Sequence, residues 1–351
     1  MRVLYIGNFE PRHSTETHIA RALESNGHTV VRVQESQPDN WFDLSEIGWL
    51  RSQEASFVLW TRTVWGDAYS SPEWVSKRLR MLVMCDRLGI PVIGYHLDRW
   101  WGLARETEPY HEPFFRVNTL VTADGGHDDE WKRIGVDHYW MPPAVSEPEC
   151  EPGMFRPEYA SDIAFVGGWH DYGHKEWTHR GELVDFLRRT YGDRVQFWPP
   201  QGQPAIRNED LRDLYASVKV LVGDSCLAPR RDGSPITRYC SDRIPETLGR
   251  GGLLIHPDVK GVTLPDYGPV DAGASLVAEV PPWVGGDHLF TWNLGDWEML
   301  QNTINLALAD PEGRSAEVRQ AGQAHTLKFH TYEQRMRRLV RLVGEWYGVK
   351  G

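Results

Sequence analysis

The sequence has few cysteines, and none of them is spaced as paired metal ligands usually are. Its four cysteines, Cys85, Cys150, Cys226 and Cys240, form no C-x-x-C pair and no zinc pattern with histidine. This excludes the common zinc modules, and free thiols fit a reducing cytoplasm. No apolar run reaches the about 18 residues that a membrane span requires. The first residues, MRVLYIG, lead into a strand without the regions of a signal peptide, so we expect a cytoplasmic protein without a membrane span.

Positive charge is scarce as well. The chain has 38 Lys and Arg against 49 Asp and Glu, which gives a formal net charge of −11. Because a surface that holds a nucleic-acid backbone needs a basic face, this balance disfavours DNA as a partner. Basic residues concentrate over residues 328–350, where a solvated helix face accounts for them.

The dinucleotide fingerprint G-x-G-x-x-G is missing from the loop that follows the first predicted strand. Its absence from Gly7–His18 argues against a simple dehydrogenase. This loop has twelve residues, whereas such connections usually have about two to six. Ser14 or Thr15 is suited to cap the next helix, and His18 lies in its first turn. The length favours a ligand-binding loop, so we expect Ser14, Thr15 and His18 to contact an acceptor or a phosphate.

What is present is an alternation of apolar runs and helical patterns, which is typical of parallel α/β sheets. Expected strands cover residues 3–6, 29–33, 55–60, 91–95, 119–122 and 138–141, then 162–166, 195–198, 218–223 and 253–255. A stretch with five prolines between Pro142 and Pro157 separates the two series. The 351 residues suit two domains, so we predict boundaries at 1–150 and 151–327. The fold class is therefore α/β, with two doubly wound, Rossmann-like domains that face a cleft.

Glycine and tryptophan follow the first strand of the second series. Gly167 and Gly168 would let the backbone approach a ligand closely, with Trp169 beside them. Among the sixteen tryptophans most are expected in the core, and a few could stack on a sugar or a base. His170, His174 and His179 are spaced by four and five residues around Gly173, which is not a compact ligand set, so we predict no metal site.

The segment GYHLDRWW places polar and aromatic residues after a buried strand of the first series. His96 and Asp98 would emerge at the cleft, next to Trp100 and Trp101. A carboxylate or an imidazole at this place could act as a general base for a sugar acceptor. A solvated loop with two packed tryptophans explains the same residues equally well.

The segment CSDRIPETLGRGGLLI combines a short helix with a glycine turn and a buried strand. Proline is tolerated in the first turn of a helix, so Pro245 places Glu246 and Thr247 near a helix N-terminus, which attracts phosphate. Arg243 adds a positive charge, and a nearby carboxylate can accept both hydroxyls of a ribose. The segment therefore suits a nucleotide, although an acid stabilised by the helix dipole explains Glu246 alone.

Together these segments resemble the group 1 glycosyltransferases of the two-domain GT-B type, and most of all the CgeB-like, spore-maturation-protein branch. The resemblance lies in ETHIARALESNGHTV, in DIAFVGG with HRGELVDFLRR, and in SDRIPETLGRGGLLI, which is similar to the R-x-x-E-x-x-x-x-G-G donor motif of the family. The final FHTYEQRMRRLVRLV looks like the closing helix that crosses back onto the first domain, here residues 328–351. The likeness spans most of the chain and is strongest over residues 160–260.

The resemblance implies a metal-independent hexosyltransferase without a cofactor, whose co-substrate is a nucleotide sugar, with a UDP-sugar favoured. The first domain would take the acceptor and the second domain the donor. Glu246 matches the glutamate that binds the donor ribose, Arg243 would hold the diphosphate, and Gly167, Gly168, Trp169, Arg238 and Thr247 would line the donor pocket. Many retaining relatives have a second glutamate eight residues before the first. Here that position is Arg238, a departure that leaves the sugar contacts and the stereochemistry open.

The sequence is compatible with three functions. The first is transfer of a sugar to a hydroxyl of a protein, glycan or other macromolecule, with a DNA base as a less favoured acceptor. The second is epimerisation of a nucleotide sugar on the same fold. The third is carbohydrate binding without catalysis, which Arg238 keeps open.

Overall fold

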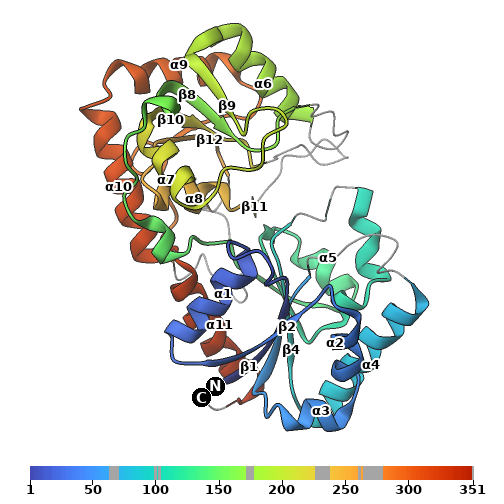
Figure 1. Ribbon diagram of the computed structural model, residues 1–351. Coiled ribbons are helices and arrows are strands. Elements are labelled where there is room, and N and C mark those ends of the chain that lie inside the picture. Colours follow the sequence, from blue (N-terminus) through green and yellow to red (C-terminus); the bar gives the residue numbers. More distant parts are fainter. Residues whose placement is uncertain are drawn as a thin grey trace.

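A computed structural model describes residues 1–62, 71–98, 101, 104–170, 178–225, 238–259, 262–263 and 280–349. These residues form two parallel sheets, each covered by helices on both faces (Figure 1). The predicted α/β class with two Rossmann-like sheets is confirmed. The predicted division at residue 150 remains a prediction.

The first sheet has six strands in the order β2-β1-β3-β4-β5-β7. Its strands are β1 (Arg2–Gly7), β2 (Thr29–Gln34), β3 (Phe57–Thr61), β4 (Val92–His96), β5 (Thr119–Thr122) and β7 (Asp137–Trp140). Its helices are α1 (Thr15–Ser25), α2 (Pro38–Leu44), α3 (Ile47–Ser52), α4 (Pro72–Leu88) and α5 (Asp128–Arg133), with 3-10 turns at Ala104–Tyr110 and Pro113–Arg116. The direction of strand order reverses between β1 and β3. In open α/β sheets, ligands bind at this switch point.

The second sheet has five strands in the order β13-β12-β10-β8-β9. Its strands are β8 (Ser161–Val166), β9 (Val195–Trp198), β10 (Val218–Val222), β12 (Leu254–Pro257) and β13 (Phe290–Trp292). Its helices are α6 (Thr178–Tyr191), α7 (Asn208–Ser217), α8 (Arg243–Gly249), α9 (Trp297–Ala309) and α10 (Arg314–Phe329), with 3-10 turns at Glu147–Cys150, Pro157–Tyr159 and Gly192–Arg194. The switch point here lies between β8 and β10.

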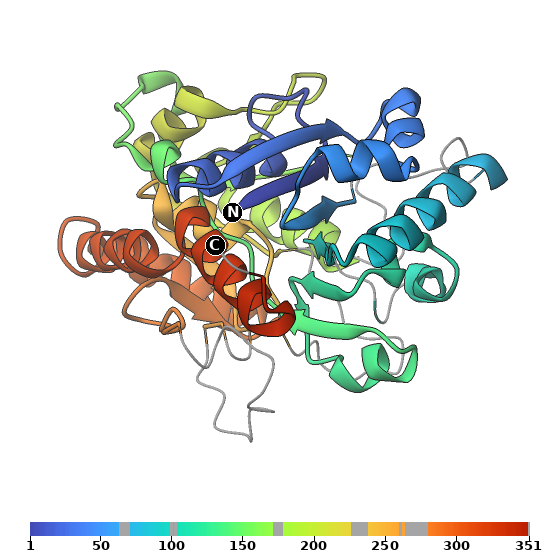
Figure 2. The ribbon, with the colours of Figure 1, turned by 90° about the horizontal axis from the view of Figure 1, so that it is seen from below.

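The last helix, α11 (Tyr332–Tyr347), packs on the first sheet. It begins with a capping box, in which Thr331 and Gln334 satisfy each other's backbone N–H groups. Its apolar face, which includes Met336, Leu339 and Val343, shares a core with β1 and α1. Figure 2 shows α11 beside these two elements, so the chain returns to its starting domain. No described helix is long and apolar enough to cross a membrane.

The two chain segments that cross between the sheets lie side by side. One is the proline-rich segment, and the other joins α10 to α11. The Val145 N–H donates to the carbonyl of His330 at 3.1 Å, and the Tyr332 N–H donates to the carbonyl of Val145 at 2.9 Å. The two crossings are thus held together by backbone hydrogen bonds.

Candidate active site

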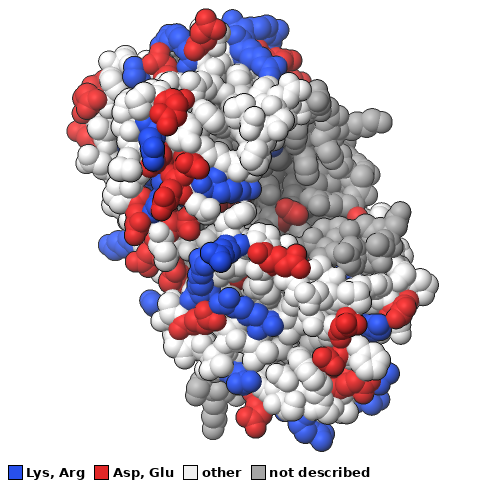
Figure 3. Space-filling view, in the orientation of Figure 1, with Lys and Arg blue, Asp and Glu red and all other residues white. Residues whose placement is uncertain are grey.

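A pocket of about 380 Å³ opens between the carboxyl ends of the two sheets. Figure 3 shows the hollow between the two halves of the molecule, with acidic and basic side chains near its rim. The first wall comes from the loop after β1 and from the ends of β3 and β4: Pro11, His13, Ser14, Thr15, Glu16, His18, Thr61, Arg62, His96, Leu97 and Asp98. The second wall comes from the other sheet and from both crossings: Ser146, Arg207, Tyr239, Asp242, Glu246 and Tyr332.

The pocket brings together six residues that the sequence singled out from distant segments. They are Ser14, Thr15, His18, His96, Asp98 and Glu246. Ser14 caps α1, because its Oγ accepts a hydrogen bond from the Thr17 N–H at 3.1 Å. His18 is only 6% exposed, and its Nδ1 has no hydrogen-bond partner. A buried, unpaired ring nitrogen at the edge of a pocket is suited to bind a polar ligand.

Glu16 occupies the switch point of the first sheet, a role that the sequence did not reveal. Its side chain folds back over Gly7, the last residue of β1. A Cβ at position 7 would lie 2.7 Å from Glu16 Cγ, so only glycine leaves room there. Glu16 is 3% exposed. Burial, assisted by the charge of Glu35, raises the pKa of Glu16 to about 7.

Arg243 occupies the equivalent switch point of the second sheet. A Cβ on Gly167, after β8, would lie 3.4 Å from the Arg243 guanidinium, and one on Gly223, after β10, would lie 3.0 Å from Arg243 Cγ. Gly167 also has a φ of +152°, which favours glycine. The arginine thus runs across the ends of both central strands. Beside it, Arg180 donates to Asp224 and to the carbonyl of Gly168, which fixes the glycine loop.

Glu246 and Asp242 present carboxylates from the start of α8. Glu246 is 22% exposed at its side chain and lies 3.6 Å from the Arg250 guanidinium, which orients it. Asp242 reaches solvent in the pocket, yet the surrounding walls and the charge of Glu246 raise its pKa to about 6. The sequence missed Asp242 and Arg207, because only the folded chain places them in this wall.

A chain of hydrogen bonds holds the backbone of Arg243. The Arg243 N–H donates to Ser241 Oγ at 3.2 Å, and Ser241 Oγ–H donates to Ser225 Oγ at 2.7 Å. Ser225 lies against His256 Nε2, while His256 Nδ1 contacts the carbonyl of Pro257 at 2.7 Å. Since the carbonyl must accept, Nδ1 carries the proton, and Nε2 accepts from Ser225. Burial lowers the pKa of His256 to about 4, so the ring stays neutral and the chain stays intact at neutral pH.

This neutral histidine makes stability depend on pH. The pKa of His256 is about 4 in the folded chain against 6.5 in the unfolded reference, so its contribution is complete above pH 6.5 and is lost as pH falls toward 4. The difference in free energy of unfolding between the wild type and His256→Phe should therefore shrink by about 2 kcal/mol from pH 7.5 to pH 5. Urea denaturation at both values measures it. A difference that stays constant would contradict the assignment.

Several predicted site residues lie elsewhere. Trp101 is 6% exposed and packs edge-on against Trp131 in the core, so it offers no face to a sugar. Trp169 donates from Nε1 to the carbonyl of Pro199 and is covered by Phe197 and Arg188. It therefore does not line the pocket.

The remaining predicted site residues are either buried, described only through their backbone, or outside the described residues. Thr247 is 1% exposed and packs inward against the Gly252 turn, so it is not available to a ligand. Arg238 is described through its backbone, which forms part of a short strand. Trp100, His174 and Cys226 lie outside the described residues.

A short strand pair joins the chain after β5 to the segment that leads into α8. β6 (Asp124–Gly125) pairs antiparallel with β11 (Arg238–Tyr239), and the Cys240 N–H donates to the carbonyl of Ala123 at 3.2 Å. β11 immediately precedes the segment of Ser241, Asp242 and Arg243. The chain that follows β5 of the first sheet is therefore joined by backbone hydrogen bonds to the segment before α8, a connection that the sequence did not predict.

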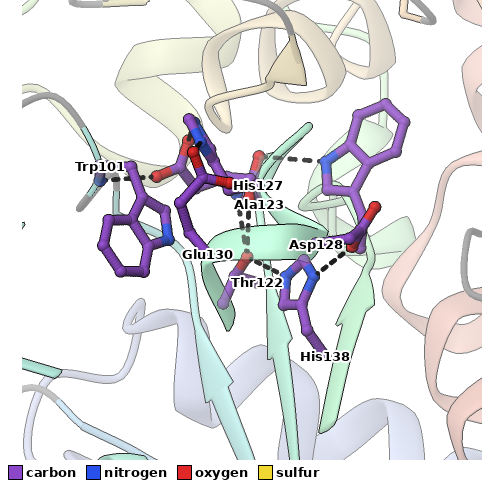
Figure 4. A network of polar contacts seen from close by, with 9 residues as sticks. Trp101, Thr122, Ala123, His127, Asp128, Glu130 and His138 are labelled. Atoms are coloured by element: carbon purple, nitrogen blue, oxygen red, sulfur yellow. Dashed lines mark hydrogen bonds and ion pairs between the residues drawn. The ribbon is translucent and has the colours of Figure 1, made fainter. Parts of the chain in front are cut away.

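A buried polar network supports β6 (Figure 4). His138 lies between Asp128 and Thr122, with Nδ1 2.8 Å from Asp128 Oδ1 and Nε2 2.9 Å from Thr122 Oγ1. The order acid, imidazole, hydroxyl is that of a nucleophilic triad. Thr122 is fully buried, however, and its hydroxyl also lies 3.2 Å from the Asp124 backbone. The network therefore positions β6 and does not present a nucleophile.

Comparisons with known proteins agree with this architecture. The sucrose-phosphate synthase of Thermosynechococcus elongatus superposes with a TM-score of 0.58 at 10% identity, covering all of both chains. A glycosyltransferase from Rickettsia africae gives 0.55 at 10% identity, covering 98% of each chain. The fold is that of the GT-B glycosyltransferases. The N-terminal domain of Candida albicans trehalose-6-phosphate phosphatase superposes with a TM-score of 0.53 at 10% identity, covering 98% of this chain and 96% of that chain.

A comparison of the sequence with protein-family models gives a second, independent similarity. Residues 175–341 match the family model described as glycosyl transferase-like. This range contains Arg243 and Glu246, the two donor residues that the motif indicates. No curated protein matches the chain in sequence. Among the described residues, no group of three or more His, Cys, Asp or Glu side chains could hold a metal ion.

Proposed function

We propose that this protein transfers a hexose from a nucleotide diphosphate, with a UDP-sugar as the favoured donor, to a hydroxyl of a protein or glycan. We place it in the CgeB-like branch and in the cytoplasm, acting without a metal ion. The observation that carries the proposal is the pairing of Arg243, across the β8–β10 switch point, with Glu246, which faces the pocket. A guanidinium suits a diphosphate, and a carboxylate suits the two hydroxyls of a ribose.

The second wall would hold the donor and the first wall the acceptor. The leaving diphosphate needs positive charge as the glycosidic bond breaks. Arg243 supplies it beside the glycine loop, and Arg207 supplies a second guanidinium in the pocket wall. On the opposite wall, His96 and Asp98, predicted from the sequence as candidate general bases, would face the acceptor.

Binding of nucleotides tests this function. UDP, GDP, UDP-glucose, UDP-N-acetylglucosamine and GDP-mannose are compared by thermal shift, because a ligand that binds the folded chain raises its stability. We expect one nucleotide series to stabilise the protein. Glu246→Gln should weaken that binding by at least about tenfold, since a hydrogen bond to a charged group contributes about 1.5–3 kcal/mol.

The matched control is Glu209→Gln, which changes an exposed glutamate in the first turn of α7. It should leave nucleotide affinity unchanged. Unaltered affinity in Glu246→Gln, or no stabilisation by any nucleotide, would refute the donor assignment. Release of a rearranged sugar from the donor alone would instead indicate an epimerase.

A further inference from the structure

Glu16 is a buried carboxylate on the first wall of the pocket, at the position where ligands bind an open α/β sheet. Glu16 lies over the end of β1, at the β1–β3 switch point, and opens into the pocket. The donor residues Arg243 and Glu246 belong to the other half of the molecule. A group bound between the two halves would therefore have the nucleotide side on one wall and Glu16 on the other.

His96 is less suited than Glu16 to accept a proton. The Asp98 N–H donates to His96 Nδ1 at 3.0 Å. Since Nδ1 accepts, the neutral ring carries its proton on Nε2 and offers a donor there. Asp98 is exposed to solvent, whereas Glu16 is 3% exposed. Glu16 differs from Asp98 because it is buried, and from His96 because its ionised oxygens carry no hydrogen.

The surroundings of Glu16 have opposing effects on its pKa, which is raised to about 7. Burial is the largest cause of its raised pKa, and Glu35 adds to the rise. Hydrogen bonds from its own backbone, from Ser14 and from Asn8 oppose the rise. Titratable and charged groups also approach from each neighbouring element: Tyr5 on β1, Glu35 after β2, Arg62 after β3, His96 on β4, and Asp242 and Glu246 across the pocket. Arg62 and Glu35 form an ion pair at 3.4 Å, which moderates the charge of Glu35.

We propose that Glu16 is the general base that takes the proton of the acceptor hydroxyl during sugar transfer; this inference rests on the function proposed above. The hydroxyl oxygen forms a bond to the anomeric carbon, and the bond from that carbon to the β-phosphate oxygen breaks. The electron pair leaves with the nucleoside diphosphate, and the hydroxyl proton moves to the Glu16 carboxylate. Glu16 then returns the proton to solvent, so no further reactant is needed.

The test uses water and free monosaccharides as acceptors, because a base in the pocket must act on them as well. The probe is the nucleotide sugar that stabilises the wild type most, and the readout is release of UDP or GDP. Glu16→Gln should lower kcat by about 100-fold or more while donor affinity stays within about twofold of the wild type. The wild-type rate should fall as pH drops below about 7, and this limb should vanish from the residual activity of Glu16→Gln.

The controls separate chemistry from structure. Glu24→Gln changes an exposed glutamate on the same helix, which pairs with Arg32, and should leave both constants unchanged. Glu16→Asp keeps a carboxylate and should recover part of kcat together with the acidic limb. If Glu16→Gln does not fold, the proposal is still tested by the pH dependence of the wild-type rate and by the kcat of Glu16→Asp.

Three results would overturn the proposal. They are a kcat of Glu16→Gln within about threefold of the wild type, a wild-type rate that is flat between pH 5.5 and 8, and a wild type that binds the donor yet releases no nucleoside diphosphate. In these cases the donor assignment survives, because nucleotide binding is measured separately. If the wild type binds no nucleotide at all, both the donor assignment and the role of Glu16 as general base are refuted.

Discussion

Arg335→Met should lower the free energy of unfolding by about 3 kcal/mol or more. The guanidinium is 1% exposed and lies where the two crossings meet. Its Nε donates to the carbonyl of Pro142 at 3.1 Å, and its two terminal nitrogens bond the carbonyl of Phe329 at 3.0 Å and His330 Nδ1 at 2.7 Å. Burial lowers the pKa of Arg335 to about 10, so it stays charged at neutral pH. Methionine would leave three buried acceptors without a donor, each at a cost of about 1–3 kcal/mol.

Urea denaturation at pH 7.5 measures this loss. Arg337→Met is the matched control, because Arg337 is exposed on the same helix and bonds Asn26 at the surface. It should change stability by less than about 0.5 kcal/mol. A loss below about 1 kcal/mol in Arg335→Met would mean that water or a shifted chain replaces the guanidinium.

Gly322→Ala should be similarly destabilising, by about 2–3 kcal/mol, because the added methyl has no space. A Cβ at position 322 in α10 would lie 2.1 Å from the carbonyl oxygen of His288 and 3.3 Å from Leu248 Cδ2. Both the backbone near residue 288 and α8 would have to move, and such overpacking of a core typically costs about 1–3 kcal/mol. The shift of α8 should also weaken nucleotide binding.

Gly48→Ala provides the control for helix propensity. Gly48 lies in α3, and no atom comes within 4 Å of a Cβ built there. Alanine should stabilise that helix by up to about 1 kcal/mol. Equal effects of the two substitutions in urea denaturation would show that contact with His288 is not what requires glycine at position 322.

The sequence predicts the sheets well because buried parallel strands have a strong local pattern. Val3–Ile6 and Ile163–Val166 are apolar runs that end before glycine, and each forms an interior strand of its sheet. The shortest elements carry no such pattern. β6 and β11 each contain two residues, and only their pairing across the two halves makes them strands.

The site could be predicted only in part. Arg243 and Glu246 follow from a motif with a fixed spacing, and Glu246 lines the pocket, while their roles toward a donor stay predictions. The role of Glu16 depends on the absence of a side chain at Gly7, nine positions earlier, and on a desolvation that no local pattern encodes. Trp101 illustrates the same limit, because the sequence does not say that it turns into the core.

The β6–β11 pair also restricts how the two halves can part. An opening of the pocket either turns about this pair and leaves it intact, or shears it and exposes its amides to water. A main-chain hydrogen bond joins Cys240 to Ala123, and Cys240 lies three residues before Arg243, where α8 begins. The start of α8 is thus attached to this pair. Under the function proposed above, a nucleotide bound at α8 would act on the pair directly, so that donor binding would be coupled to the angle between the two halves.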